Sequence, residues 1–505
     1  MKEKIESILG KKVVLVHPKD LKNGDYTIIA DVETAEEDLR KLESSKLEEV
    51  DKVELVNKRF INIYLSQKFF QESLEKVIEK GENFGKGDKF KGERAMVEHT
   101  DPNPFKEFHI GHLMPNVIGS TIARIFEWSG AEVKQVNYQG DVGLHIAKAL
   151  WANGDYAKGN KAYEEDLEAK KEIQEINKKV YEKSDPELNK RYEEGKKKSL
   201  AKFEEMYKRL GTKFDYYFFE SETGEVGKKI VLENIGKVFE ESDGAVVFKG
   251  SHTRVFMNSQ GLPTYEAKDL GNAKLKYEKY PYTKSLIVTG NEIKDYFKVV
   301  LEAMAQVLPE LANKTLHLPH GMLRLSTGKM SSRTGTIISA EDLIDEVKTR
   351  VKGDEQVAIG AIKYMILRQA IGHDIIFDFE KSVSTEGDSG VYLQYAHARA
   401  CSVLEKAGSQ GRTLNTDLPA GEAGSQGPTL VRLLYRFPEI IERAALEYAP
   451  NYITTYLTEL ASSFNNFYAR EQIIGNDYRL AITRAFRIVM RNGLEILGIP
   501  APDKM

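Results

Sequence analysis

Two histidines that flank an isoleucine and a glycine are the residues best suited to chemistry on a phosphate. His109, Gly111 and His112 follow a short apolar run at 95–97 and precede a long amphipathic run at 113–128. This order predicts a strand, a loop and the start of a helix. A helix N-terminus attracts anions, and two imidazoles can donate hydrogen bonds to a polyphosphate as negative charge builds up on it.

A pair of histidines at this spacing is also compatible with helix capping or with burial in a core, so a second element matters. Segment 328–335 reads Gly-Lys-Met-Ser-Ser-Arg-Thr-Gly, a composition that is also typical of a surface turn. Lys329, between glycine and methionine on a mobile loop, could close over the phosphates of a leaving pyrophosphate.

Together, 109–112 and 328–335 resemble the paired HIGH and KMSKS signatures of class I aminoacyl-tRNA synthetases. The flanks narrow the resemblance to the arginyl-tRNA synthetases. They comprise 97–112, Val-Asn-Tyr-Gln-Gly-Asp at 136–141, Leu-Gln-Tyr-Ala-His-Ala-Arg at 393–399, and the ending at 497–505. These segments run in order along essentially the whole chain.

The resemblance implies roles for four residues in holding an amino acid. Glu98 and Asn103 match positions that bind the ammonium and carboxylate ends. Tyr265 and Asp269 match positions that read a guanidinium, and their i, i+4 spacing places them on one helix face. The alternative for this pair is a surface tyrosine and an aspartate of a first helical turn.

The resemblance also implies an ATP site, accompanied by Mg²⁺ that ATP brings with it and by no metal site made of protein ligands. The implied ATP-binding residues are His109, Gly111, His112, Gly290, Glu292, Met322, Lys329, Met330, Ser331 and Ser332. Ser332 stands where the signature usually has a second lysine. Lys106, three residues before His109, is expected to supply that charge and to complete a catalytic set with His109, His112 and Lys329. A solvent-exposed loop lysine is the alternative.

Three further positions depart from the family pattern. Ile293 replaces a glutamine, Tyr296-Phe297 replaces a His-Phe pair, and Val142 replaces an aromatic residue. The departures leave the resemblance intact but alter the expected pocket. His145 and Asn137 lie beside that pocket in the sequence pattern, with a weak case for a direct role.

Composition predicts a cytoplasmic protein of about three domains, since domains average about 150 residues. The 505 residues are 41% hydrophobic and 30% charged, with a net charge of −4. No apolar run approaches the ~20 residues that span a bilayer, and the first residues lack the apolar core of a secretory signal. Cys401 is the sole cysteine, which excludes an intramolecular disulfide and predicts a buried, inert thiol. The chain is not basic overall, so contacts with RNA would come from local patches.

The patterns predict a multidomain α/β protein. Residues 1–85 read as a small α+β domain with strands at 12–17, 26–30 and 59–64 and a helix at 34–47, followed by a linker at 81–92. Residues 93–375 should form a Rossmann-like catalytic domain. Strand-like runs at 95–97, 133–138, 245–248, 285–288 and 316–318 alternate with helices there, which favours a parallel sheet with ligands at the carboxyl ends of its strands.

Two other regions are predicted to be helical. Segment 156–209 is rich in lysine and glutamate at helical spacing, and the favoured interpretation is a solvent-exposed insertion with a solvated salt-bridge face. Residues 385–505 should form an all-α domain with helices at 391–407, 430–447, 452–471 and 478–497 around a Gly- and Ser-rich loop at 408–429. The resemblance makes it an anticodon-binding domain, and makes 1–85 a domain that contacts tRNA. Arg484, Arg487 and Arg491 share one helix face and are either phosphate contacts or ordinary surface arginines.

The leading hypothesis is an arginine–tRNA ligase that binds ATP, L-arginine and tRNA(Arg), with no DNA and no membrane partner, and with a monomer expected from the resemblance. Three alternatives remain: a class I synthetase for another amino acid such as lysine or glutamine, a small-molecule adenylyltransferase, and a non-catalytic RNA-binding or scaffold protein. Asp269 and the 393–399 segment argue against the first. The helical C-terminal region argues against the second, and His109, His112 and Lys329 argue against the third.

Overall fold

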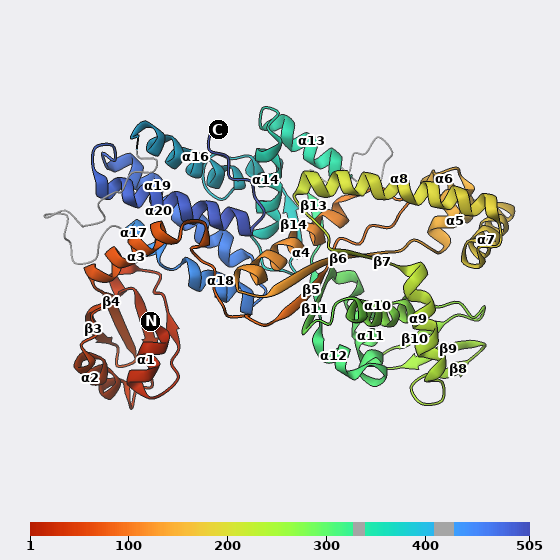
Figure 1. The fold of residues 1–505 in the computed structure, drawn as a ribbon, viewed down its shortest axis with the longest axis horizontal. Coiled ribbons are helices and arrows are strands. Elements are labelled where there is room, and N and C mark those ends of the chain that lie inside the picture. Colours follow the sequence, from red (N-terminus) through yellow and green to blue (C-terminus); the bar gives the residue numbers. More distant parts are fainter. Residues whose placement is uncertain (327–338, 409–428) are drawn as a thin grey trace.

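The computed structural model describes residues 1–326, 339–408 and 429–505. Figure 1 shows an elongated molecule with a small sheet module at one end, a parallel sheet near the middle and a helical bundle above and between them. The long helix α8 (Pro186–Leu210) runs from the centre to the far end, where α6 (Tyr156–Glu165) and α7 (Leu167–Glu182) lie beside it.

The N-terminal module is a four-stranded antiparallel sheet in the order β1-β2-β4-β3. Its elements are α1 (Lys2–Leu9), β1 (Leu15–Val16), η1 (Leu21–Asn23), β2 (Tyr26–Ile29), α2 (Ala35–Ser45), β3 (Val50–Val56), β4 (Phe60–Leu65), α3 (Gln67–Lys80) and η2 (Gly81–Asn83). The structure confirms the strands expected at 26–30 and 59–64 and the helix expected at 34–47. The strand expected at 12–17 is shorter than predicted and consists of β1 alone. Strand β3 escaped prediction because a register shift between Val50 and Lys52 interrupts its alternation of polar and apolar residues.

A five-stranded parallel sheet forms the centre of the molecule. It consists of β5 (Arg94–Glu98), β6 (Glu132–Gln139), β7 (Tyr216–Phe219), β11 (Lys284–Gly290) and β12 (Thr315–His320), in the order β12-β11-β5-β6-β7. The strand order reverses between β5 and β11, so the carboxyl ends of these two strands form the switch point at which such sheets bind ligands. The strands expected at 95–97, 133–138, 285–288 and 316–318 are confirmed.

The strand expected at 245–248 exists but does not belong to this sheet. It is β9 (Ala245–Lys249), in a separate antiparallel sheet between β8 (Glu240–Ser242) and β10 (Thr253–Met257). Asp243 and Gly244 link β8 to β9 with φ of 51° and 77°, which is the Asp-Gly hairpin turn that joins antiparallel strands. The strand that fills the parallel sheet instead is β7, a short run of aromatic residues.

Helix α4 (Ile110–Trp128) packs on one face of the parallel sheet. Ala95, Met96 and Val97 of β5 are fully buried, as expected of a strand covered on both faces. Ala95 and Val97 join the core that contains α4, whereas Met96 joins a separate cluster on the other face. Gly119 permits the close approach, because a Cβ there would lie 2.4 Å from the Cβ of His99. The packing therefore fixes α4 relative to the loop that follows β5.

The remaining elements complete the middle of the chain. They are α5 (Leu144–Trp151), α9 (Glu220–Glu233), α10 (Tyr265–Lys279), η3 (Asn291–Ile293), α11 (Lys294–Val307), α12 (Pro309–Lys314), β13 (Leu323–Leu325), α13 (Ala340–Arg350), α14 (Glu355–Leu367), β14 (Ile375–Phe377) and α15 (Phe379–Ser382). The helices expected in 156–209 are confirmed as α6, α7 and α8.

The C-terminal region is helical, with α16 (Gly390–Lys406), α17 (Thr429–Leu434), α18 (Phe437–Leu446), α19 (Asn451–Arg470) and α20 (Asp477–Ile496). The prediction of a single helix at 430–447 is wrong, because the helix is interrupted between α17 and α18. Pro438 lies in the first turn of α18, where it cannot donate the hydrogen bond that would continue a helix.

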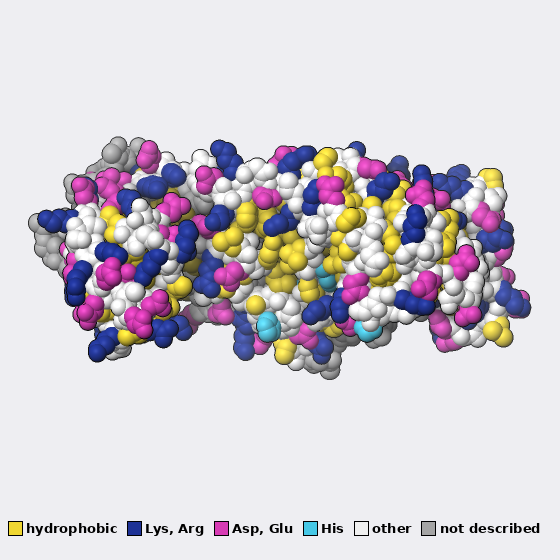
Figure 2. Space-filling model, turned by 90° about the horizontal axis from the view of Figure 1, so that it is seen from below, with side chains coloured by type: hydrophobic (Ala, Val, Ile, Leu, Met, Phe, Trp, Pro, Cys, Tyr) yellow, Lys and Arg dark blue, Asp and Glu magenta, His cyan; other side chains and the backbone are white. Residues whose placement is uncertain are grey.

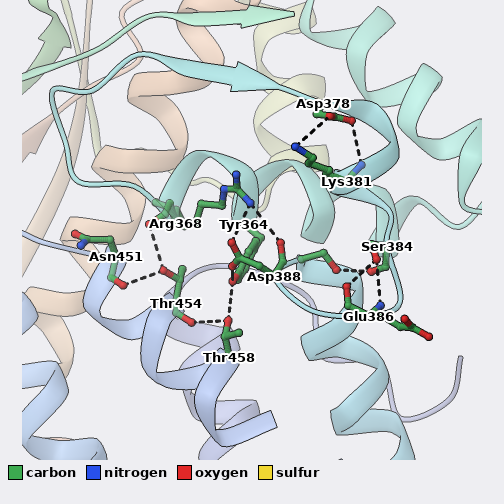
Figure 3. A network of polar contacts seen from close by, with 12 residues as sticks. Tyr364, Arg368, Asp378, Lys381, Ser384, Glu386, Asp388, Asn451, Thr454 and Thr458 are labelled. Carbon is green, nitrogen blue, oxygen red and sulfur yellow. Dashed lines mark hydrogen bonds and ion pairs between the residues drawn. The ribbon is translucent and has the colours of Figure 1, made fainter. Parts of the chain in front are cut away.

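A polar network joins α14 to the C-terminal helices (Figure 3). The Tyr364 hydroxyl contacts both the Asp388 carboxylate and the Thr458 hydroxyl, the latter at 2.6 Å. Arg368 adds an ion pair with Asp388 at 3.0 Å. The network anchors α19 against the end of α14.

A buried ion pair docks the N-terminal module on the helical bundle. Arg432 Nε donates to Asp25 Oδ1 at 2.7 Å, and its Nη2 donates to the carbonyls of Leu21 and Gly24, each at 3.0 Å. Asp25 is fully buried and Arg432 is 5% exposed. Removing one member of such a pair leaves the other charge buried and uncompensated.

Arg432→Leu is therefore expected to weaken docking of the N-terminal module by about 3–5 kcal/mol. Urea unfolding combined with hydrogen exchange of β2 would measure the loss. Arg443→Leu is the control, because Arg443 is 58% exposed in its pair with Glu447 and such pairs contribute about 0–1 kcal/mol. Equal effects of the two substitutions would contradict the assigned role of Arg432.

Figure 2 shows that acidic and basic side chains are interspersed over one long face, with hydrophobic side chains gathered near its middle. No large field of one sign appears on this face, in keeping with the near-neutral composition. Within the described ranges, no helix has both the length and the apolar character of a membrane span. Cys401 is buried, and burial raises the pKa of its thiol to about 12, as expected for an inert thiol.

Candidate active site at the carboxyl ends of β5 and β11

His109 and His112 flank the first turn of α4, and each contributes to its cap. Nδ1 of His109 accepts a hydrogen bond from the Gly111 backbone N at 3.1 Å. The His109 backbone N donates to Nδ1 of His112 at 3.2 Å. The two rings stack with centroids 3.8 Å apart. The predicted order of strand, loop and helix start is confirmed, and the capping interpretation of the histidines is compatible with phosphate binding.

The cap also decides which ring nitrogen carries the proton. A neutral imidazole that accepts through Nδ1 carries its hydrogen on Nε2. Burial lowers the pKa of His109, and the nearby positive charge of Lys106 lowers it further. Burial lowers the pKa of His112 well below its usual value, and the electrostatic effect of His109 lowers it further. Both rings are therefore neutral near pH 7 and can donate from Nε2 to phosphate oxygens at a helix start.

Gly111 lies in the exposed first turn of α4. A Cβ at this position would lie 2.8 Å from Cε1 and Nδ1 of the His109 ring, so any side chain would displace that ring. Glycine therefore preserves the cap and leaves the backbone open to a ligand.

The loop between β5 and α4 is strained and firmly held. Thr100, Asp101 and Phe105 have φ of 82°, 44° and 67°, a region that residues with a Cβ seldom adopt. Asn116 Nδ2 donates to the Thr100 hydroxyl at 3.1 Å, and the Tyr138 backbone N donates to Asp101 Oδ1 at 2.8 Å. Strain of this kind persists where neighbours over-determine it, as at functional sites.

Asn103 lies in the same loop, with its oxygen already engaged. Oδ1 accepts a hydrogen bond from the Gly140 backbone N at 2.9 Å, which leaves the NH₂ group as the donor for a carboxylate. His145 Nε2 bonds the Gly140 carbonyl at 2.7 Å, and burial lowers the pKa of His145 to about 4. Asn137 Nδ2 donates to the His99 carbonyl at 3.3 Å. His145 and Asn137 thus support the loops of the site.

Glu98 ends β5 and is almost fully buried, with 3% of its surface exposed. Its Oε2 accepts hydrogen bonds from Lys276 Nζ at 2.7 Å and Asn272 Nδ2 at 2.9 Å. Burial disfavours the charged form of Lys276, whereas the charge and hydrogen bond of Glu98 favour it. The pKa of this lysine is raised overall. Lys276 and Asn272 escaped sequence analysis because they come from α10, far along the chain. One oxygen of Glu98 is thus occupied by protein donors.

Asp269, also on α10, accepts a hydrogen bond from the Tyr296 hydroxyl at 2.6 Å through Oδ2. Burial raises the pKa of Asp269 to about 8, against the opposing effect of Tyr296. Burial and then the charge of Glu98 raise the pKa of Asp101 well above its usual value. Neighbouring buried carboxyl groups that resist ionisation gain most from a cationic ligand.

A small cavity reaches this acidic cluster. Its polar lining consists of Glu98, Asp269, Asn272, Lys276 and Thr315, and its apolar lining includes Ile287, Phe297, Val300, Leu301 and Met304. With a volume of about 10 Å³, the cavity has room for about one water molecule beside these polar groups.

Tyr265, Glu292 and Met322 lie nearer the surface than the acidic cluster. Tyr265 begins α10 one turn before Asp269 and is 57% exposed. Gly290 ends β11, and a Cβ there would lie 2.2 Å from Oε2 of the exposed Glu292. Met322 is 42% exposed, and its backbone N donates to Asp374 at 2.9 Å. Lys329, Met330, Ser331 and Ser332 lie outside the described residues.

The charged insertion borders the site, which corrects its interpretation as a purely solvated face. Tyr192 and Lys196 of α8 bond Oδ2 of Asp141 at 2.9 and 2.7 Å, and Asp141 is fully buried. The periodicity of the insertion predicted its helices correctly. It did not show that one side of α8 packs on the Gly140-Asp141 loop, because a lysine's partners depend on tertiary structure.

Comparisons with known proteins agree with this geometry. Residues 73–379 match the family described as "tRNA synthetases class I (R), catalytic domain", and residues 393–505 match the "DALR anticodon binding domain". An arginine–tRNA ligase of Treponema denticola is 31% identical, over 88% of this chain and 85% of the relative.

Two solved structures share the fold. The arginyl-tRNA synthetase of Thermus thermophilus gives a TM-score of 0.76 at 24% identity, and that of Plasmodium falciparum gives 0.79 at 19% identity. In both cases the match covers 100% of this chain and 99% of the other. At these identities the likeness shows the fold alone. The catalytic-domain family matches more than half of this chain, and the Treponema relative covers most of it. The chain therefore belongs to the arginyl-tRNA synthetases, the class I arginine–tRNA ligases.

Proposed function

We propose that the site activates L-arginine with ATP and transfers the arginyl group to the 3′-terminal ribose of tRNA(Arg). In the first step an arginine carboxylate oxygen attacks the α-phosphate and pyrophosphate leaves. In the second step a ribose hydroxyl attacks the arginyl carbonyl and AMP leaves. The observation that carries the proposal is that β5 leads both to a buried acidic cluster and to a pair of neutral histidine donors.

The start of α4 fits the phosphates of ATP. His109 and His112 donate from Nε2, and Gly111 leaves the backbone accessible. Such donors stabilise the charge that develops as pyrophosphate departs. Gly290, Glu292 and Met322 would border the nucleoside, and 329–332 would cover the phosphates. Mg²⁺ would enter with ATP and balance the phosphate charge.

The acidic cluster fits arginine. Asp269 pairs with the guanidinium, whose planar fork suits a carboxylate, with Tyr265 at the same helix end. The NH₂ group of Asn103 donates to the carboxylate of arginine. Glu98 binds the ammonium through Oε1, which accepts no bond from any residue in the described ranges.

The partners follow from the same assignment. The helical region 393–505 would bind the anticodon loop of tRNA(Arg), and 1–85 would contact another part of that tRNA. We propose a monomer as the active form. Arg484, Arg487 and Arg491 remain candidates for phosphate contacts on α20.

ATP–pyrophosphate exchange with each amino acid, with and without total tRNA, tests the proposed function. Exchange is expected with arginine and with no other amino acid. Exchange with lysine or glutamine instead would overturn the assignment of the acidic cluster. An absence of exchange with every amino acid, with tRNA present, would favour a non-catalytic protein.

Lys106→Ala is expected to lower kcat for arginine-dependent exchange by about ten- to a hundredfold, since a cation that stabilises transferring phosphates is lost. The KM for arginine should change little. Lys161→Ala is the control, because Lys161 is a surface residue of α6, 73% exposed in its pair with Glu165. An unchanged kcat in Lys106→Ala would show that Lys106 does not replace the missing signature lysine.

A further inference from the structure

Lys106 lies under the insertion. Its Nζ is 4.9 Å from the centre of the Tyr156 ring, at the start of α6. In the part of the chain that the structure describes, Lys106 forms no ion pair, and the carboxylate that acts on its charge is Glu220. Burial and then the positive charge of Lys148 lower the pKa of Lys106, and the negative charge of Glu220 opposes them. The face of the Tyr156 ring lies within cation–π distance of this ammonium and favours its charged form.

Helix α8 holds the backbone on which Lys106 stands. Phe105, the preceding residue, has φ of 67°, and its backbone N donates to the Ser199 hydroxyl at 2.9 Å. The Phe105 ring lies so close to Gly195 that a Cβ there would be 2.2 Å from the ring atom Cε1. The ring also stacks on Tyr192 with centroids 6.4 Å apart. Three positions of α8 thus maintain the strained conformation next to Lys106.

The contacts with Tyr156 and with α8 both come from segment 156–209, whose helices also carry exposed ion pairs within the segment. Lys161 with Glu165, Lys171 with Glu168, and Lys178 with Glu182 are such pairs. The contacts of Tyr156, Gly195 and Ser199 differ because they fix a cation beside the helix start that carries His109. A ring face suits this task better than a carboxylate, because a carboxylate would neutralise the charge meant for a phosphate.

We propose that Tyr156 is a positioning residue for Lys106, and that the insertion holds this lysine at the phosphate end of the active site. The inference rests on the proposed role of Lys106 in the activation of arginine. The insertion is then a wall of the catalytic site that sets the rate of the first step. Its effect should fall on kcat and leave the binding of arginine intact.

A double-mutant cycle with arginine-dependent ATP–pyrophosphate exchange, run on the full chain with tRNA, tests the inference. Tyr156→Leu is expected to lower kcat about three- to tenfold with an unchanged KM for arginine, and Tyr156→Phe, which keeps the ring, should restore kcat. In a Lys106→Ala background, Tyr156→Leu should have no further effect. Tyr216→Leu is the control, because Tyr216 lies under Lys279 at the amino end of β7, away from the site, and should leave kcat unchanged.

Gly195→Ala gives a second measurement that does not touch Tyr156. The added methyl group would push against Phe105, so kcat should fall in the natural background and remain unchanged in the Lys106→Ala background. If Lys106→Ala itself has no effect, the proposed role of Lys106 fails. If Lys106→Ala lowers kcat but Tyr156→Leu does not, or if Tyr156→Leu costs the same without Lys106, the positioning role is overturned.

Discussion

His112→Asn is expected to lower kcat for arginine activation by about a hundred- to a thousandfold while leaving the fold intact. The amide oxygen of asparagine can take the place of Nδ1, so the cap that accepts from the His109 backbone N at 3.2 Å would persist. The donor at Nε2 would be lost. Removal of one donor that stabilises developing charge costs about 10²–10³ in kcat. Single-turnover formation of the adenylate would measure the loss.

His112→Gln is the matched control for this prediction, because its NH₂ group can reach the position of Nε2 while its oxygen cannot maintain the cap. It should recover part of kcat and lose some thermal stability. The opposite ranking, with asparagine more active than glutamine, would assign His112 to capping alone. Because the pKa of His112 lies well below its usual value, acidification from about pH 7.5 to about pH 6.5 should leave kcat at saturating arginine unaffected by this ring.

The first half of the site could be predicted from the sequence because it is local. His109, Gly111 and His112 follow a strand and start a helix, so chain order alone brings them to the carboxyl edge of a sheet. The i, i+4 relation of Tyr265 and Asp269 is likewise a property of one helix. The structure confirms both arrangements.

The other half depends on contacts between distant segments, which one sequence does not reveal. Lys276 and Asn272 reach Glu98 across more than 170 positions. Tyr296 was recognised as a departure from the family pattern, but its bond to Asp269 follows only from the packing of α11 on α10. Similarly, the prediction placed the strand at 245–248 in the parallel sheet. A short apolar strand looks the same in sequence whether a hairpin turn or a crossover helix connects it to its neighbour.

Those distant contacts lead to the second large effect, on the recognition of arginine. Asp269→Asn is expected to raise the KM for arginine by about a hundred- to a thousandfold, since loss of one member of a buried charge pair costs about 2–5 kcal/mol. The reaction at saturating arginine should be much less affected. Steady-state exchange kinetics with arginine would separate the two effects.

The ionisation of Asp269 makes the same interaction depend on pH. Burial raises the pKa of Asp269 to about 8, so near pH 7 the free enzyme holds this group mostly protonated, and a guanidinium must displace the proton. The KM for arginine should therefore fall as pH rises from about 6.5 and should level off above about 8.5, with close to a tenfold change per pH unit below the pKa. In Asp269→Asn this dependence should disappear.

Tyr296→Phe provides the discriminating variant. Its hydroxyl donates to Asp269 Oδ2 at 2.6 Å and favours the charged carboxylate, so its removal should shift the fall in KM to higher pH. Tyr277→Phe is the control, because Tyr277 lies on α10 but bonds the exposed Glu310 and should leave the profile unchanged. A flat KM profile in the natural protein would mean that arginine binds without ionisation of Asp269. A Tyr296→Phe profile that coincides with that of the natural protein would exclude this hydroxyl from control of the carboxylate.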